Sequence, residues 1–280
     1  MTNERLYIVD GVDAHNIRIG SGYKSIANVI LCTMGDEFNI ILIDELENHL
    51  HPALLRTLVN EIKQLPKTCV IATTHSAILV NEFNIEEIID TQKGNLSKLL
   101  CDKVARNKIN TFLHPGRAEL LLADNVILVE GFTEEVILRK YISNNKLNWT
   151  VVNVAGVMFE PYVKLAASLG KALVAVSDND RSESENGIIP TSRFNKLKEL
   201  CSKSSVKLIE VDNTLETDLY NCGYLDDRFE DLIKVHKKHS TIKISKPKMK
   251  TAIAHKIIDE EIDLSGWHVI REIHSEFDNN

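Results

Sequence analysis

Short apolar runs that end on acidic residues are the most regular pattern along this chain. Residues 126–129 (Val-Ile-Leu-Val) lead into Glu130, and residues 172–176 (Ala-Leu-Val-Ala-Val) lead into residues 177–180 (Ser-Asp-Asn-Asp). Both runs are rich in Val, Leu and Ile and are bounded by turn formers, which is typical of buried parallel strands. A helix-like run, residues 135–142, separates them. The pattern predicts an α/β fold whose strands deliver carboxylates to the edge where open α/β sheets bind ligands.

Four of these carboxylates are expected to converge on one point: Glu130, Glu134, Asp178 and Asp180. Asp178 and Asp180 are two positions apart, so they point the same way in an extended chain. Such a cluster repels itself unless a cation lies between its members. Hard oxygen ligands without nearby Cys or His pairs favour Mg²⁺ or Mn²⁺. The alternative is a set of ordinary acids at solvated strand ends, but the order of the two motifs favours a metal site.

The two motifs resemble the Toprim domain, the metal-binding fold of topoisomerases, primases and several nucleases. Its hallmark is a Glu after the first strand and a DxD after a later one, matched here by residues 129–131 (Val-Glu-Gly) and 178–180 (Asp-Asn-Asp). After a further expected strand, residues 206–211, Glu216 and Asp218 resemble a third acidic element of the metal cluster. Helix capping is the competing interpretation for both, because acidic residues favour the first turn of a helix.

A different strand pattern occupies the N-terminal part of the chain. Residues 39–43 are an apolar strand ending on Asp44 and Glu45, and residues 68–72 are a second strand ending close to His75, with an amphipathic helix expected between the strands. This order resembles the Walker B strand, D-loop and switch histidine of DNA-associated ABC ATPases. A generic α/β unit with two acids at a strand end is the alternative.

The ABC resemblance implies roles for particular residues. Asp44 would order Mg²⁺ and water near the phosphates, Glu45 would position or deprotonate the attacking water, and His75 would sense the γ-phosphate. Gly20-Ser21-Gly22 would be the signature loop, in which Ser21 and Gly22 contact a nucleotide held by a partner head.

The Walker A motif GxxxxGK[ST] does not occur in the sequence. Residues 20–25 do not fit it, because Tyr23 stands where the motif requires a Gly before the Lys. That loop contributes most of nucleotide binding in such heads. We therefore expect ATP binding only when a missing N-terminal segment or a partner chain supplies Walker A. Otherwise the ATPase half is degenerate and serves as a scaffold or dimer surface.

An ABC-type head followed by a Toprim module is similar to the overcoming-lysogenization-defect (OLD) family of ATP-linked nucleases, some of which act in anti-phage defence. We place the C-terminal half of the ATPase domain at residues 1–114 and the Toprim domain, with a basic extension, at residues 115–280. The resemblance implies a DNA endonuclease with two Mg²⁺ or Mn²⁺ ions, and a homodimer formed through the ATPase-like half.

The densest basic run fits a DNA partner. Seven lysines occur in this run, at positions 234, 237, 238, 243, 246, 248 and 250. Lysine contacts to phosphate are the sequence-independent part of DNA binding, although such a run can also be a solvated surface. Lys250 resembles a family lysine close to the scissile phosphate, where a cation stabilises developing charge. Lys246 and Lys248 are alternatives for that role.

Composition adds few constraints. The chain has 280 residues, 44% of them hydrophobic and 26% charged, as in ordinary soluble proteins. Its five cysteines are scattered and form no CxxC pair, which predicts reduced thiols, a cytoplasmic location and no zinc site. The net charge of −7 gives no overall sign of nucleic-acid binding, yet an acidic metal site accounts for part of it. A non-catalytic binding or regulatory subunit remains the alternative to an enzyme.

Overall fold

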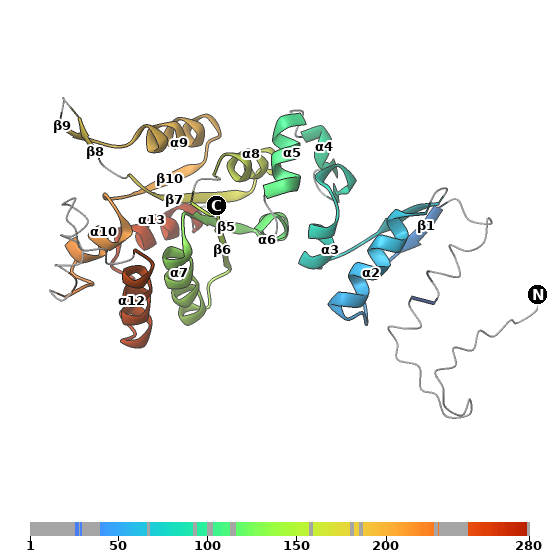
Figure 1. Cartoon of the computed structure of the whole chain (residues 1–280), viewed down its shortest axis with the longest axis horizontal. Helices are drawn as coiled ribbons and strands as arrows, with labels where there is room; N and C mark the ends of the chain where they lie inside the picture. The colour runs from blue at the N-terminus through green and yellow to red at the C-terminus, as the bar shows by residue number, and fades with distance from the viewer. Residues whose placement is uncertain are drawn as a thin grey trace, which may run out of the picture. The chain divides into compact units, whose positions relative to one another are not determined.

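The computed structural model divides into two compact units, residues 1–82 and residues 83–280 (Figure 1). It describes residues 26–27, 29, 40–65, 68–91, 94–99, 103–112, 116–156, 159–179, 182–184, 187–226, 229 and 246–278. No helix in this described part of the chain is both long and apolar enough to cross a membrane.

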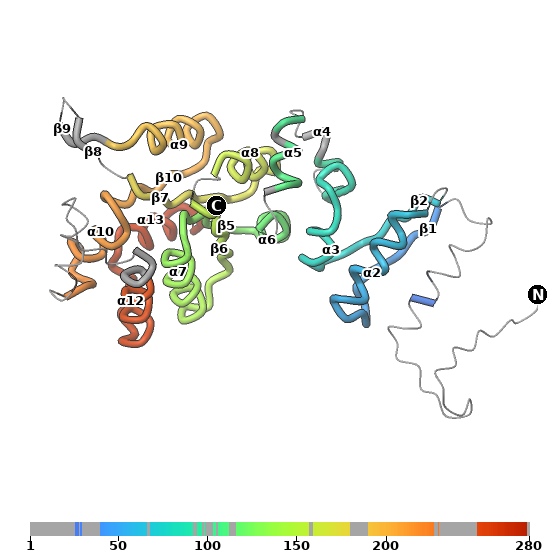
Figure 2. The backbone as a smooth tube through the Cα atoms, viewed as in Figure 1, coloured from blue at the N-terminus to red at the C-terminus, as the bar shows by residue number. Residues whose placement is uncertain are grey.

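The first unit contains the strand–helix–strand pattern expected from the sequence. Strand β1 (Ile40–Ile43) pairs in parallel with β2 (Cys69–Ala72), and α2 (Pro52–Lys63) connects them, as can be followed in Figure 2. Helix α2 begins at a proline, which is pre-organised for a first helical turn, and the side chain of His51 caps it by accepting from the backbone N–H of Ala53. Helix α3 (Ala77–Glu82) closes the unit.

Residues 83–122 form small elements that belong to the second compact unit. They are η1 (Ile85–Glu87), the antiparallel pair β3 (Ile89–Asp90) and β4 (Gly94–Asn95), α4 (Leu96–Leu99), α5 (Lys103–Phe112) and α6 (Gly116–Leu122). The buried guanidinium of Arg117 in α6 donates to the side chain of Asn110 in α5 and to the backbone oxygen of Phe83, which connects α6 to both. The division after residue 82 reflects contacts within the chain, whereas the boundary that we placed at residue 115 separates two families of domain. That domain boundary stays a prediction.

A four-stranded parallel sheet forms the centre of the second unit, which confirms the predicted α/β class. Its order is β10 (Lys207–Val211), β7 (Ala172–Asp178), β5 (Asn125–Val129) and β6 (Trp149–Asn153). The two apolar runs singled out in the sequence are β5 and β7, the central neighbours. Strands buried on both faces lack polar alternation, which is why these runs are continuously apolar.

Helices cover both faces of this sheet (Figure 1). On one face, α7 (Phe132–Asn145), α12 (Lys246–Asp259) and α13 (His268–Phe277) share a core with alternate strand residues such as Ile127 and Val129. On the other face lie α8 (Phe159–Leu169) and α9 (Ser192–Lys203). Among the described residues, the hairpin β8 (Ser182–Ser184) and β9 (Gly187–Ile189) follows β7, and helix α10 (Leu215–Asn221) follows β10.

Candidate functional site

The structure brings Glu130 and Asp178 together at the carboxyl edge of the sheet. Glu130 directly follows β5, and Asp178 is the last residue of the neighbouring parallel strand β7. The backbone N–H of Asp178 donates to Oε2 of Glu130 over 3.4 Å, and the Asp178 side chain is buried. The first two acids predicted from the sequence therefore lie at neighbouring strand ends.

Glu134 belongs to the same corner of the chain. It lies in the first turn of α7, which begins after Gly131, and it is only 4% exposed. A Cβ added to Gly131 would lie 3.0 Å from Oε2 of Glu134, so the glycine leaves room for that carboxylate next to the strand end. Glu134 is therefore a buried acid close to the end of β5, and its role as a metal ligand stays a prediction.

Asn179, the middle residue of the DxD, fixes this edge of the sheet. It is 1% exposed, and its side chain donates to Oε1 of Glu210 over 2.8 Å and accepts from the backbone N–H of Asn213 over 2.7 Å. Its backbone carbonyl accepts from the N–H of Thr191, the residue that caps α9. Asn179 thus joins the end of β7 to the loop after β10 and to the start of α9.

The third acidic element lies in α10, and its two acids have different surroundings. Thr214 caps this helix by accepting from the backbone N–H of Thr217. Both Glu216 and Asp218 are buried. Asp218 accepts a hydrogen bond from the indole of Trp267, so its carboxylate is engaged in holding the C-terminal helix. The metal role predicted for both acids stays a prediction.

Several predicted residues lie outside what the structure describes. Asp180, Ser21 and Gly22 are outside the described residues, as are the first four lysines of the basic run. Lys246, Lys248 and Lys250 lie in the first turns of α12. The side chains of these three lysines are also outside the described part of the chain.

The donor chemistry of the edge fits a hard divalent cation. Glu130, Glu134 and Asp178 offer only carboxylate oxygens, which Mg²⁺ and Mn²⁺ prefer. Within the described residues, however, no three His, Cys, Asp or Glu side chains are grouped around one point that could hold a metal ion. The metal role predicted for these three acids stays a prediction.

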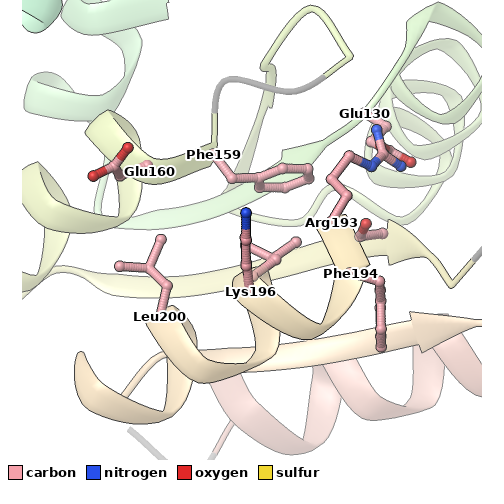
Figure 3. A pocket seen from close by; sticks show the side chains of 9 residues that line it. Glu130, Phe159, Glu160, Arg193, Phe194, Lys196 and Leu200 are labelled. Atoms are coloured by element: carbon pink, nitrogen blue, oxygen red, sulfur yellow. The ribbon is translucent and has the colours of Figure 1, made fainter. Parts of the chain in front are cut away.

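Arg193 is a site residue that sequence reasoning missed. It lies in the first turn of α9, where its Nη2 forms an ion pair with Oε1 of Glu130 and its Nη1 donates to the backbone oxygen of Gly156 over 3.0 Å. Figure 3 shows the two side chains meeting at one end of a pocket. The only local signal in the sequence was the helix start at Thr191, which does not point to Glu130.

The ATPase-like unit also brings its predicted acids to a strand end. Oδ1 of Asp44 accepts from the hydroxyl of Thr73 over 2.6 Å, and the same hydroxyl accepts from the backbone N–H of Glu45. Glu45 adopts a positive φ of 49°, a conformation that is rare outside glycine and common at functional turns. Thr73, the residue after β2, therefore bonds both to the side chain of Asp44 and to the backbone of Glu45, the two residues that follow β1.

Glu47 connects the following loop to the predicted switch histidine. Its Oε1 accepts from the backbone N–H of His75 over 2.8 Å. Burial acts to raise the pKa of Glu47, but hydrogen bonds from its own backbone, from His75 and from Thr74 outweigh it and leave the pKa below its usual value. The carboxylate stays ionised and holds the His75 backbone next to the strand end that carries Asp44.

Comparison with known proteins agrees with this two-part arrangement. Residues 14–81 match the AAA domain family described as putative AbiEii toxin, Type IV TA system. Residues 121–180 match the TOPRIM domain of overcoming lysogenization defect protein-like proteins. No curated protein matches the chain. The Toprim match covers β5, α7, β6, α8 and β7, and so includes Glu130, Glu134 and Asp178. With an ATPase-like segment followed by an OLD-like Toprim domain, the chain has the domain arrangement of an OLD family nuclease.

Proposed function

We propose that this protein is a metal-dependent DNA endonuclease that hydrolyses phosphodiester bonds and is linked to an ATPase module. The observation that carries the proposal is the pairing of Glu130 with Asp178 at the carboxyl ends of adjacent parallel strands, inside the segment that matches an OLD-like Toprim domain. Glu130 and Asp178 end adjacent parallel strands at the edge where open α/β sheets bind ligands, which supports cation binding there.

The chain's own residues would have separate tasks in this reaction. Glu130, Glu134 and Asp178 would hold Mg²⁺ or Mn²⁺, and Asp180 and Glu216 would be further ligands. When bound, a pair of such ions lowers the pKa of water and offsets charge on the attacking and leaving oxygens. Asn179 would keep the Asp178 turn rigid through its bonds to Glu210 and Asn213. Lys250 would offset charge on the scissile phosphate.

The N-terminal unit would couple this chemistry to ATP. Asp44 and Glu45, held by Thr73, would face a nucleotide whose Walker A loop is supplied elsewhere, and His75 would contact its terminal phosphate. Dimerisation through this unit would bring two heads together. The support for dimerisation and for a role in anti-phage defence is the family resemblance alone.

Cleavage of supercoiled plasmid tests the proposal. The purified chain is incubated with Mg²⁺, Mn²⁺ or EDTA, and Asp178→Ala is compared with wild type. The matched control is Asp124→Ala, which removes an exposed acid just before the opposite end of β5. We expect metal-dependent nicking or linearisation that is lost in Asp178→Ala and retained in Asp124→Ala. Folded wild-type protein that binds metal and never cuts DNA would instead favour a binding or regulatory subunit.

A further inference from the structure

A pocket adjoins the carboxylate edge and extends between α8 and α9. Its volume is about 400 Å³, within the range of small-ligand pockets. Its walls come from the strand ends, the start of α8 and one face of α9: Glu130, Phe159, Glu160, Ser177, Arg193, Phe194, Lys196, Leu197 and Leu200. Because Glu130 forms part of its wall, whatever occupies the pocket lies directly beside the predicted metal ligands (Figure 3).

The charges in this pocket leave one cation available for an anionic ligand. Glu160 is neutralised by Lys164 and Lys108, over 2.8 and 3.3 Å, and Glu130 is paired with Arg193. Lys196 is exposed and, within the described part of the chain, makes no ion pair. Figure 3 shows its ammonium group pointing toward Phe159. An ammonium group held over a pocket without a carboxylate partner suits a phosphate group.

The rest of the pocket wall is apolar. Phe159 contributes an aromatic ring, and Leu197 and Leu200 line the wall along α9. Aromatic and aliphatic surface beside a phosphate-binding cation matches the two chemistries of a nucleotide, since every base offers a face that stacks on an aromatic ring. A duplex cannot enter a pocket of this size without unpairing, whereas one nucleotide of a single strand can.

We propose that this pocket binds one nucleotide of a DNA strand, with Lys196 on its phosphate and with Phe159 and Leu200 against its base. This inference rests on the proposed nuclease function and deepens it, because it names unpaired DNA next to the scissile bond as the substrate. Arg193 lines the same pocket and is paired with Glu130, so it can contact the same strand once a metal ion competes for that carboxylate.

Binding in EDTA tests the pocket without any cleavage. A fluorescein-labelled hexamer of thymidylate, dT6, is titrated with the full chain at several salt concentrations, and Lys196→Ala is compared with Lys198→Ala. Lys198 lies on the same helix but approaches Glu210 outside the pocket. We expect Lys196→Ala to weaken binding about fivefold at 0.1 M salt and to reduce the slope of log K against log salt by about 0.7, as for one lost phosphate contact. Lys198→Ala should retain the wild-type slope.

A second comparison tests whether the pocket contacts the base. The same titration uses a hexamer of abasic deoxyribose phosphates, which carries the backbone charge without bases. We expect dT6 to bind at least about fivefold more tightly than the abasic hexamer. Leu200→Trp narrows the pocket at a half-buried position and should remove most of that preference.

The results separate this inference from the nuclease proposal. Two results would overturn the proposal that the pocket binds a nucleotide, even if the protein cuts plasmid DNA. They are equal effects of Lys196→Ala and Lys198→Ala, and equal binding of dT6 and the abasic hexamer. A selective loss in Lys196→Ala would support the pocket even if plasmid cleavage is never observed, because the titration requires no metal.

Discussion

The indole Nε1 of Trp267 donates a hydrogen bond of 2.6 Å to Oδ2 of Asp218, and both side chains are buried. The imidazole of His268 lies 3.1 Å from the same oxygen. This contact joins α10, which carries the third acidic element, to the start of the C-terminal helix α13. Since Trp267 donates to the Asp218 carboxylate and His268 lies beside it, Glu216 is the better candidate for a metal ligand from α10.

Replacing Trp267 by Phe should destabilise the fold through Asp218. Phenyl is smaller than indole, and the buried carboxylate also loses its indole donor, a loss that costs about 1–3 kcal/mol. Urea unfolding followed by circular dichroism measures the loss. Trp149→Phe is the matched control, because Trp149 packs by its ring edge against His274 and Phe277. Equal losses in the two variants would show that ring volume, rather than the bond to Asp218, explains the effect.

Arg193→Gln should tighten Mg²⁺ binding. The guanidinium holds one oxygen of Glu130, so a metal ion must displace it and also approach its positive charge. Ion pairs of this exposure are worth at most about 1 kcal/mol, so the affinity should rise by up to about fivefold. Isothermal titration of the metal-free protein measures it. Lys198→Gln removes the same charge from α9 away from Glu130 and should leave the affinity unchanged. Weaker binding in Arg193→Gln would contradict this account.

The buried thiol of Cys201 should make the fold sensitive to alkaline pH. Burial raises the pKa of Cys201 to about 11 from an ordinary value of 9.0. Above pH 9 the unfolded chain loses this proton while the folded chain keeps it. The contribution of Cys201 to the free energy of unfolding is therefore fully present below pH 9 and is lost between pH 9 and 11. The loss from this group between pH 8 and 10 is about 1 kcal/mol.

Urea unfolding of wild type and Cys201→Ala at pH 8, 9 and 10 checks this prediction. Removing the thiol opens a small cavity, so the variant should be less stable at pH 8. The gap between the two proteins should shrink as the pH rises, because only wild type loses the Cys201 contribution. Parallel curves would mean that the thiol titrates alike in the folded and unfolded states.

Gly116→Ala should be destabilising because α6 approaches its neighbours closely. A Cβ at this position would lie 2.6 Å from the hydroxyl oxygen of Tyr162 and 2.9 Å from Cγ1 of Val152. Overpacking of this kind typically costs about 1–3 kcal/mol. Thermal and urea unfolding measure the cost.

A double-mutant cycle with Tyr162→Phe identifies the cause. Removing the hydroxyl relieves the shorter of the two contacts, so Gly116→Ala should cost less in the Tyr162→Phe background than in wild type. Strictly additive losses would show that the Tyr162 hydroxyl does not limit the approach of α6.

Much of the fold and part of the site follow from local sequence patterns. Continuous apolar runs bounded by turn formers predicted β5 and β7 as buried parallel strands, and the acids after them predicted that Glu130 and Asp178 would lie at one edge of the sheet. The carboxyl ends of parallel strands share one edge of a sheet, so a one-dimensional pattern was enough. The same reasoning brought Asp44 and Glu45 to a strand end, and the family matches agree with both segments.

Other features required the tertiary structure, because they depend on contacts between residues far apart in the chain. Arg193 reaches Glu130 only because α9 packs beside β7, and no local pattern marks one half-buried arginine for one carboxylate. The C-terminal segment showed no functional signal in the sequence, yet Trp267 holds Asp218. The sequence alone therefore determined the strands and the acids at their ends, since backbone periodicity is local. Packing decided which cations and donors those acids meet, since that depends on how the helices fold onto the sheet.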